Sequence, residues 1–232
     1  MEMTTASRDV MLLTPELVAL TLRVVPDEGP EPRWTLHSED ELDALAEKID
    51  REAGPDPIWI FAYGSLIWNP EFKVDARERA TAYGWHRAFS LRIERWRATS
   101  AQPGLMMALE RGGRCDGLIL RLSQESRRQD LRALLAREIP YREVVDMVRW
   151  LPVKTAHGTQ RALTFWASTK RHALTTPVPL VEAASAIARA CGPAGSCAQY
   201  LRNTVADLSE EGIRDRNLWQ LQALVAEELT KG

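Results

Sequence analysis

An apolar stretch at residues 58–68 constrains the fold more strongly than any other part of this sequence. It reads Ile-Trp-Ile-Phe-Ala-Tyr-Gly-Ser-Leu-Ile-Trp, so a β-prone run ends abruptly in Tyr63-Gly64-Ser65 and then resumes. A short apolar run closed by glycine and serine predicts a buried strand followed by a tight turn. We therefore expect the rest of the domain to pack around this strand.

The turn after this strand has two interpretations. Gly64 can adopt a positive φ, or it can let the backbone approach a ligand closely. Successive amides at such a turn can point into a concavity and bind an anionic group, and Ser65 adds a hydroxyl there. The residues alone favour a simple turn over a binding loop, and both interpretations stay open at this point.

Length and charge limit the class of protein. A chain of 232 residues is long enough for one domain with additions and a substantial core. Its 30 basic and 32 acidic residues are interleaved and give a formal net charge of −2, so we expect no nucleic-acid partner. No apolar run approaches membrane-spanning length, and the N-terminus carries no signal segment. We expect a cytoplasmic protein without a membrane partner, either a monomer or a homodimer.

The cysteines and histidines give no sign of a metal site. An odd number of cysteines without metal-ligand spacing is most simply read as reduced thiols, with a Cys191–Cys197 disulfide as the alternative. Cys115 has no recognisable histidine partner and is expected to be a small core residue. We expect no metal, because ligand spacing is also absent among the histidines, which are His37, His86, His157 and His172.

Two helix starts can be recognised in the N-terminal part of the chain. Thr14 precedes Pro15, which is the arrangement of an N-cap followed by proline at the first helical position. Ser38 is followed three residues later by Glu41, which has the form of a capping box. Each start is followed by apolar residues at helical spacing, so two helices are predicted here.

The N-terminal part is expected to be an addition to the main domain. We predict a disordered lead-in at residues 1–10, and the sequence Gly-Pro-Asp-Pro at residues 54–57 separates the second helix from the apolar strand. The predicted organisation is therefore a helical extension, residues 1–56, packed on a domain of residues 57–232.

The middle of the chain is rich in strand patterns. Residues 82–122 are mainly strand, and the pair Gly112-Gly113 predicts a hairpin turn between strands at residues 106–110 and 115–122. Strands in the middle with helices towards the ends predict an α+β fold. The further predicted elements are a helix at 124–137, strands at 144–153 and 162–167 with a turn at His157-Gly158 between them, and helices at 181–191, 196–208 and 215–229.

Several strings of residues resemble a known family. Residues 61–70, Phe-Ala-Tyr-Gly-Ser-Leu-Ile-Trp-Asn-Pro, resemble the Tyr-Gly-Ser-Leu signature of the ChaC-type γ-glutamylcyclotransferases, with Ala62 where the family commonly has glycine. Residues 102–106 and 109–113, with Gly117, resemble bacterial members, and residues 200–205 also resemble the family. The resemblance implies a γ-glutamylcyclotransferase-like fold, with a small mixed β-sheet or barrel core and helices at the ends.

The resemblance also implies a reaction. A glutathione-specific γ-glutamylcyclotransferase is a lyase in which the substrate's α-amine attacks its own γ-carbonyl, giving 5-oxoproline and cysteinylglycine from glutathione. Both reacting groups belong to the substrate, so no cofactor, metal or covalent residue is implied. Two alternatives remain: a cyclotransferase for other γ-glutamyl amino acids or amines, and a non-catalytic binding or regulatory protein linked to cation transport.

The family's functional residues map onto particular positions here. The Arg137-Glu138 pair resembles the family's Arg-Glu element, which makes Glu138 the implied base and then acid. The Gly64, Ser65 and Leu66 amides are the implied donors to the substrate's α-carboxylate. The loop implied to hold the γ-glutamyl head comprises Ile60, Phe61, Ala62, Tyr63, Gly64, Ser65 and Leu66, and Tyr141 is the implied tyrosine after the glutamate.

Glu138 is identified by the resemblance and not by the residues themselves. At the end of a predicted helix it would otherwise be a solvated carboxylate, and Arg142-Glu143 repeats the dipeptide, although Glu143 is expected at the surface. A working base needs a raised pKa from partial desolvation. Adjacent helix residues do not face each other, so we expect Arg137 to point away from Glu138. We also expect Glu138 and the loop amides to line one cavity.

A basic and aromatic cluster follows the first long strand pattern. It comprises Arg92, Arg95, Trp96 and Arg97. The residues favour a solvated strand and loop, and a clamp for the glycine carboxylate of glutathione is the alternative.

Overall fold

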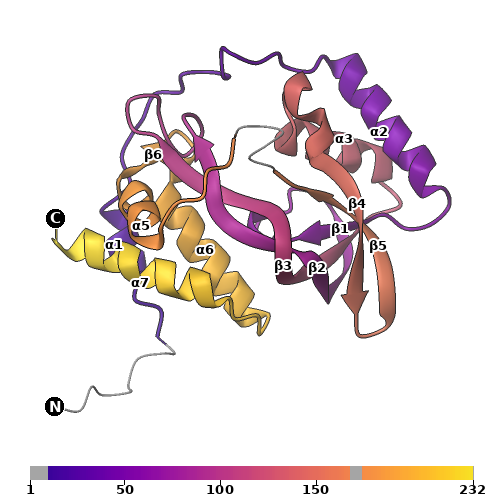
Figure 1. Ribbon diagram of the computed structural model, residues 1–232. Helices are drawn as coiled ribbons and strands as arrows, with labels where there is room; N and C mark the ends of the chain where they lie inside the picture. The colour runs from indigo at the N-terminus through magenta and orange to yellow at the C-terminus, as the bar shows by residue number, and fades with distance from the viewer. Residues whose placement is uncertain (1–9, 168–173, 232) are drawn as a thin grey trace.

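The computed structural model describes residues 10–167 and 174–231, so nine of the ten residues predicted to be a disordered lead-in lie outside the described part. Its centre is a closed barrel of five strands in the order β1-β3-β2-β4-β5 (Figure 1). Strand β1 pairs antiparallel with β3 and parallel with β5, which closes the barrel. The strands are β1 (Trp59–Ala62), β2 (Val74–Ile93), β3 (Gly104–Leu122), β4 (Val148–Thr155) and β5 (Gly158–Phe165).

Strand β1 occupies the central place that its apolar sequence predicted. Ile60, Phe61 and Ala62 are fully buried. Because side chains alternate along a strand, Phe61 packs into one hydrophobic cluster while Ile60 and Ala62 pack into another. The turn after β1 continues into a short 3-10 helix, η1 (Ser65–Ile67), in which Leu66 and Ile67 are buried. The loop is therefore anchored in the core at both of its ends.

The hairpin predicted at Gly112-Gly113 is wrong, because β3 runs without interruption through both glycines. Both have a positive φ, 108° and 71°, and the register between β2 and β3 shifts nearby, between Tyr83 and Trp85. Glycines with positive φ beside a register shift mark a bulge at which a paired ribbon can bend. Strands β2 and β3 are thus one long hairpin with its turn at residues 94–103.

Two further strand predictions are partly wrong. The strand predicted at residues 144–153 begins as a 3-10 helix, η2 (Arg142–Met147), and becomes β4 only at Val148. Strand β5 begins four residues earlier than predicted, directly after the turn at His157. A locally apolar run does not distinguish a 3-10 turn from a strand when tertiary packing decides between them.

The helices lie on two sides of the barrel (Figure 1), and the combination of helices with a mainly antiparallel barrel is the α+β class expected from the sequence. The C-terminal helices lie with α1 on one side, and α2 packs against α3 on the other (Figure 1). None of the helices in the described residues combines the length and apolarity that a membrane crossing requires. The helices are α1 (Pro15–Ala19), α2 (Glu39–Ala53), α3 (Arg127–Glu138), α5 (Leu180–Arg189), α6 (Cys197–Glu210) and α7 (Arg216–Lys231), with short strands β6 (Cys191–Gly192) and β7 (Gly195–Ser196) before α6.

Both predicted N-terminal helix starts are confirmed. The Thr14 hydroxyl accepts a hydrogen bond from the Leu17 amide, and Ser38 and Glu41 form a complete capping box. Between α1 and α2 the chain crosses from one side of the molecule to the other (Figure 1). We call residues 20–38 the N-terminal connection.

Candidate active site

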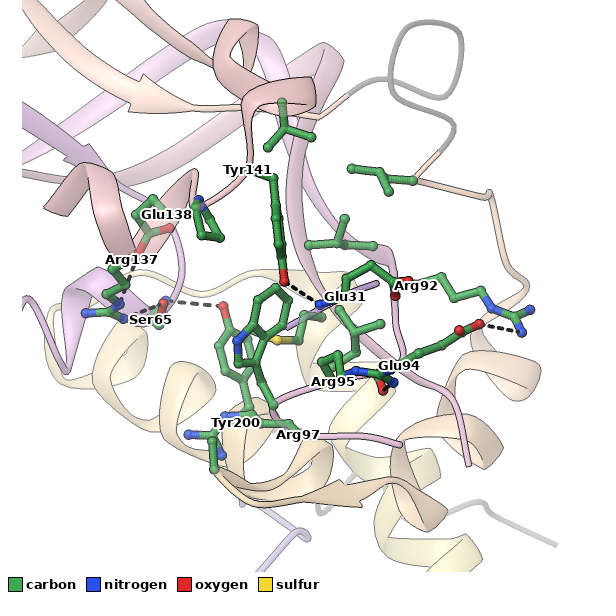
Figure 2. A pocket seen from close by; sticks show the side chains of 18 of the residues that line it. Glu31, Ser65, Arg92, Glu94, Arg95, Arg97, Arg137, Glu138, Tyr141 and Tyr200 are labelled. Atoms are coloured by element: carbon green, nitrogen blue, oxygen red, sulfur yellow. Dashed lines mark hydrogen bonds and ion pairs between the residues drawn. The ribbon is translucent and has the colours of Figure 1, made fainter. Parts of the chain in front are cut away.

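A cavity of about 630 Å³ lies where several parts of the chain meet. Figure 2 shows Ser65, Arg137 and Glu138 grouped at one end of it and Arg92, Glu94 and Arg95 at the other. Its polar walls come mainly from the loop after β1 (Ser65, Trp68, Asn69, Glu71), the end of α3 with the residues after it (Arg137, Glu138, Tyr141), the end of β2 with the β2–β3 turn (Arg92–Arg97), the N-terminal connection (Glu31, Arg33, Trp34) and α6 (Tyr200).

Glu138 is the last residue of α3, and its side chain is only 21% exposed. Burial raises the pKa of this carboxyl above its usual range, the neighbouring Arg137 charge opposes that rise, and the Glu71 charge adds to it. A buried carboxylate with a raised pKa in a cavity is a candidate general base. The desolvation expected from the sequence is therefore present at this residue.

The prediction that Arg137 points away from Glu138 is wrong. The Arg137 Nε lies 3.2 Å from the Glu138 Oε1. The arginine also donates to the Asn69 carbonyl at 2.6 Å and to the Ser65 hydroxyl at 3.2 Å. These acceptors draw the long side chain across the end of the helix, so the spacing rule for adjacent helical residues does not decide its position. Arg137 therefore connects the carboxylate to the loop.

Replacing Arg137 is expected to move the pH dependence of activity. Because the guanidinium lowers the pKa of Glu138, Arg137→Met should raise that pKa and shift the acid limb of kcat/KM to higher pH. The profile of Arg128→Met should be measured as a control, because it removes an α3 arginine that pairs with Glu47 and does not line the cavity. An unshifted acid limb in Arg137→Met would show that this charge does not act on the titrating group.

Gly64 owes its position to a close contact and not to a positive φ. Its φ is −145°, so the positive-φ alternative is wrong. A Cβ at this position would lie 2.9 Å from the Tyr200 hydroxyl oxygen, which is too close for a side chain. The Ser65 amide donates to that same oxygen at 3.3 Å. The absence of a side chain at Gly64 thus allows the loop backbone to contact the Tyr200 hydroxyl.

Tyr200 links the loop to the interior of the cavity. Burial raises the pKa of its hydroxyl to about 12, so the group stays protonated at neutral pH. Because its oxygen accepts from the Ser65 amide, its own hydrogen can be donated to another acceptor. The ring also packs edge-to-face against Trp68 with centroids 5.8 Å apart. Tyr200 can therefore both support the loop and donate to a bound molecule.

The predicted loop residues divide into three groups. Ser65 lies in the cavity wall with Glu138 and Tyr141. Tyr63 supports the loop through its carbonyl, which accepts from the Arg87 guanidinium at 2.9 Å, and the Glu138 charge adds to the raised pKa of its buried phenol. The remaining predicted loop residues are buried and do not line the cavity: Ile60, Phe61, Ala62, Gly64 and Leu66. The expectation that the Gly64 and Leu66 amides share the cavity with Glu138 is therefore wrong.

Tyr141 joins the cavity wall to the N-terminal connection. Its hydroxyl accepts from the Glu31 amide at 2.8 Å, and its ring meets Trp34 edge-on at 5.1 Å. Glu143 is exposed, as expected, and accepts from the Thr35 amide at 3.0 Å. Only the first of the two Arg-Glu pairs therefore contributes its glutamate to the cavity.

Sequence reasoning assigned no role to several residues of this wall. Tyr200 belongs to the family-like string at residues 200–205, so the resemblance could have identified it. Glu31 and Trp34 have no such signal, because only the crossing of the N-terminal connection brings them here. The basic cluster also lines the cavity, although Arg92 and Trp96 are exposed, as the solvated interpretation predicted.

The thiols, and the imidazoles of the described residues, are absent from the lining of this cavity. Cys115, Cys191 and Cys197 are buried and free, and burial raises the pKa of Cys115 to about 11, as befits a core residue. Within residues 10–167 and 174–231, no three histidine, cysteine or acidic side chains come close enough to hold a metal ion. His172 lies outside the described residues.

Comparisons with known proteins agree with the fold and the sequence strings. The sequence model of the ChaC-like protein family matches residues 58–228. The chain is 34% identical to the glutathione-specific γ-glutamylcyclotransferase of Escherichia coli (strain K12), over 93% of this chain and 83% of the relative. It is 28% identical to γ-glutamylcyclotransferase 2-3 of Arabidopsis thaliana, over 71% of this chain and 86% of the relative.

A solved structure shows the same architecture. The crystal structure of a γ-glutamyl cyclotransferase specific to glutathione from yeast superposes with a TM-score of 0.63 at 19% identity. The alignment covers 75% of this chain and 100% of the yeast chain. From the match over residues 58–228, the extent of the bacterial relative and this shared architecture, we conclude that the chain belongs to the ChaC-like protein family.

Proposed function

We propose that this protein is a γ-glutamylcyclotransferase that cleaves glutathione to 5-oxoproline and cysteinylglycine. The observation that carries the proposal is the Glu138 carboxylate, partly buried with a raised pKa, in the same cavity as Ser65. The bacterial relative, similar over nearly the whole chain, is named for glutathione, which supports that substrate over other γ-glutamyl compounds.

The proposed reaction needs one proton carrier. Glu138 takes a proton from the substrate ammonium, and the free amine attacks the γ-carbonyl to form the new ring C–N bond. As the bond to cysteinylglycine breaks, Glu138 returns this proton to the leaving nitrogen. The regenerated carboxylate then takes the second proton from the ring nitrogen and passes it to the released amine, so that cysteinylglycine leaves as an ammonium and Glu138 ends ionised. The cavity supplies proximity by holding the γ-glutamyl chain in a folded shape.

The loop and the N-terminal extension have supporting roles in this proposal. The loop from Ile60 to Leu66 positions the γ-glutamyl head, with Ser65 nearest to the substrate and the Tyr200 hydroxyl beside it. Residues 1–56 are an extension of the catalytic domain, and they complete the cavity through the contacts of Glu31 and Trp34 with Tyr141. Tyr141 forms the wall between these two parts.

A product assay tests the proposal. The protein should release 5-oxoproline and cysteinylglycine from glutathione in equal amounts, and faster than it releases 5-oxoproline from γ-glutamylcysteine, which lacks the glycine. Release from the dipeptide alone would favour a cyclotransferase for other γ-glutamyl compounds. The absence of release from both would overturn the enzyme proposal in favour of a binding protein.

A further inference from the structure

The charges around the cavity are balanced with one exception. Five arginines line it, and four of them lie within 4 Å of a carboxylate: Arg33, Arg92, Arg95 and Arg137. In the part of the chain that the structure describes, Arg97 is the one member of this set with no carboxylate at ion-pair distance. A cation facing a cavity without a counter-charge can accept an anionic ligand without giving up an internal ion pair.

Arg97 is also held firmly in place. Its Nη1 donates to the Ser196 carbonyl at 3.2 Å and to the Gln199 Oε1 at 3.0 Å. The guanidinium lies 5.8 Å from the Trp68 ring centroid and 5.7 Å from that of Tyr200. Both hydrogen bonds that the described residues give it use Nη1, so Nε and Nη2 can form the two parallel bonds of a carboxylate.

The position of Arg97 indicates which carboxylate it would meet. The hydroxyl of Tyr200 contacts the Ser65 amide, whereas its ring faces Arg97. In Figure 2, Glu138 and Arg97 accordingly lie at different ends of Tyr200. The substrate's α-carboxylate shares a carbon with the amine that Glu138 must reach, so it stays at the Glu138 end. The carboxylate of the leaving group is free to extend towards Arg97.

We propose that Arg97 binds the glycine carboxylate of glutathione and thereby selects substrates whose leaving group ends in an anion. This inference rests on the proposed glutathione cleavage and adds the site for its leaving group. Burial lowers the pKa of Arg97 because the charged form is partly desolvated, and a bound carboxylate would offset that cost. The Arg92 and Arg95 guanidiniums, already paired with Glu94 and Glu28, are not required for this contact.

The test combines two enzymes with two substrates. The second substrate is the glutathione analogue in which the glycine carboxylate is a carboxamide, and the variant is Arg97→Met, which keeps the length and removes the charge. For the unmodified protein, kcat/KM for the carboxamide should be about 10- to 100-fold below that for glutathione, the effect of one charged hydrogen-bonded pair. Relative to the unmodified protein, Arg97→Met should have a kcat/KM for glutathione that is lower by a similar factor. Its kcat/KM for the carboxamide should be nearly the same as that of the unmodified protein.

The controls separate recognition from folding. Arg97→Lys should recover part of the lost rate on glutathione but not on the carboxamide, because it restores the charge without the planar fork. Arg128→Met, on the outer side of α3, should behave as the unmodified protein does on both substrates. Thermal unfolding of each variant shows whether a loss of rate comes from loss of structure.

Two results would overturn the inference. Equal kcat/KM for glutathione and the carboxamide with the unmodified protein would show that the glycine carboxylate is not recognised, whatever the variants do. Equal losses on both substrates in Arg97→Met would show that Arg97 serves the γ-glutamyl part or the fold. Failure of the proposed function is distinct, because the unmodified protein would then release 5-oxoproline from neither substrate.

Discussion

Glu138→Gln is expected to lower kcat/KM for glutathione by about 10² to 10⁴-fold, the usual contribution of a positioned general base. Glutamine keeps the shape of the side chain but cannot carry the proton from the ammonium to the leaving nitrogen. The loss should appear in kcat as well as in kcat/KM, because the amide can still occupy the carboxylate's place while substrate binds.

The variant should also be folded at neutral pH, which makes its inactivity informative. The folded-state pKa of Glu138 lies above its unfolded value, so the native state holds the proton more tightly. Stability therefore falls as pH rises from the usual glutamate pKa through the raised value, and above it the cost of the buried charge is fully present. Glutamine removes that charge, while Arg137 keeps its hydrogen bonds to Ser65 and Asn69. The melting temperature at pH 7 should be no lower than that of the unmodified protein.

The same shift sets the pH range of activity in the unmodified protein. The base works only when ionised, so kcat/KM should decline as pH falls through the raised pKa of Glu138, above the range of an exposed glutamate. Glu143→Gln is the matched control. It changes the glutamate of the second Arg-Glu pair, which lies outside the cavity, and should leave activity unchanged. Substantial turnover by a folded Glu138→Gln protein would contradict the assignment of the base.

Local sequence rules worked where the structure itself is local. The caps at Thr14 and Ser38 depend on bonds that reach only three residues along the chain, and both form as predicted. The pair Gly112-Gly113 shows the limit of such rules. Two glycines in a row indicate that positive φ values are possible here. Whether such residues form a bend within a strand or a hairpin turn depends on the pairing of β3 with β2, which the local sequence does not show.

In the candidate site, too, the local sequence predicted some features and missed those that depend on distant residues. The family-like strings identified Glu138, Ser65 and Tyr141, and these three side chains do share one cavity. The position of Arg137 was missed, because its acceptors, Ser65 and Asn69, lie about seventy residues earlier in the chain. Contacts of this separation leave no periodic pattern in the sequence.

The segment that carries Arg97 depends on one glycine from a distant part of the chain. Gly192 lies in β6, directly beneath residues 96–98. A Cβ at this position would collide with the Trp96 carbonyl oxygen and lie 2.6 Å from the amide nitrogen and carbonyl oxygen of Ala98. All of these atoms belong to the backbone, so no side chain can rotate away to make room.

Gly192→Ala is therefore expected to destabilise the protein by about 3 kcal/mol or more, at the upper end of overpacking costs. Urea unfolding measures the change. Gly54→Ala is the control: Gly54 has a φ of 64° and a ψ of −142° but open space around its Cβ position, so that substitution should cost the backbone strain alone, about 1 to 3 kcal/mol. Because the displaced backbone carries Arg97, folded Gly192→Ala protein should also discriminate less between glutathione and its carboxamide. A stability equal to that of the unmodified protein would mean that β6 can move away from residues 96–98, and that the β2–β3 turn is not fixed by this contact.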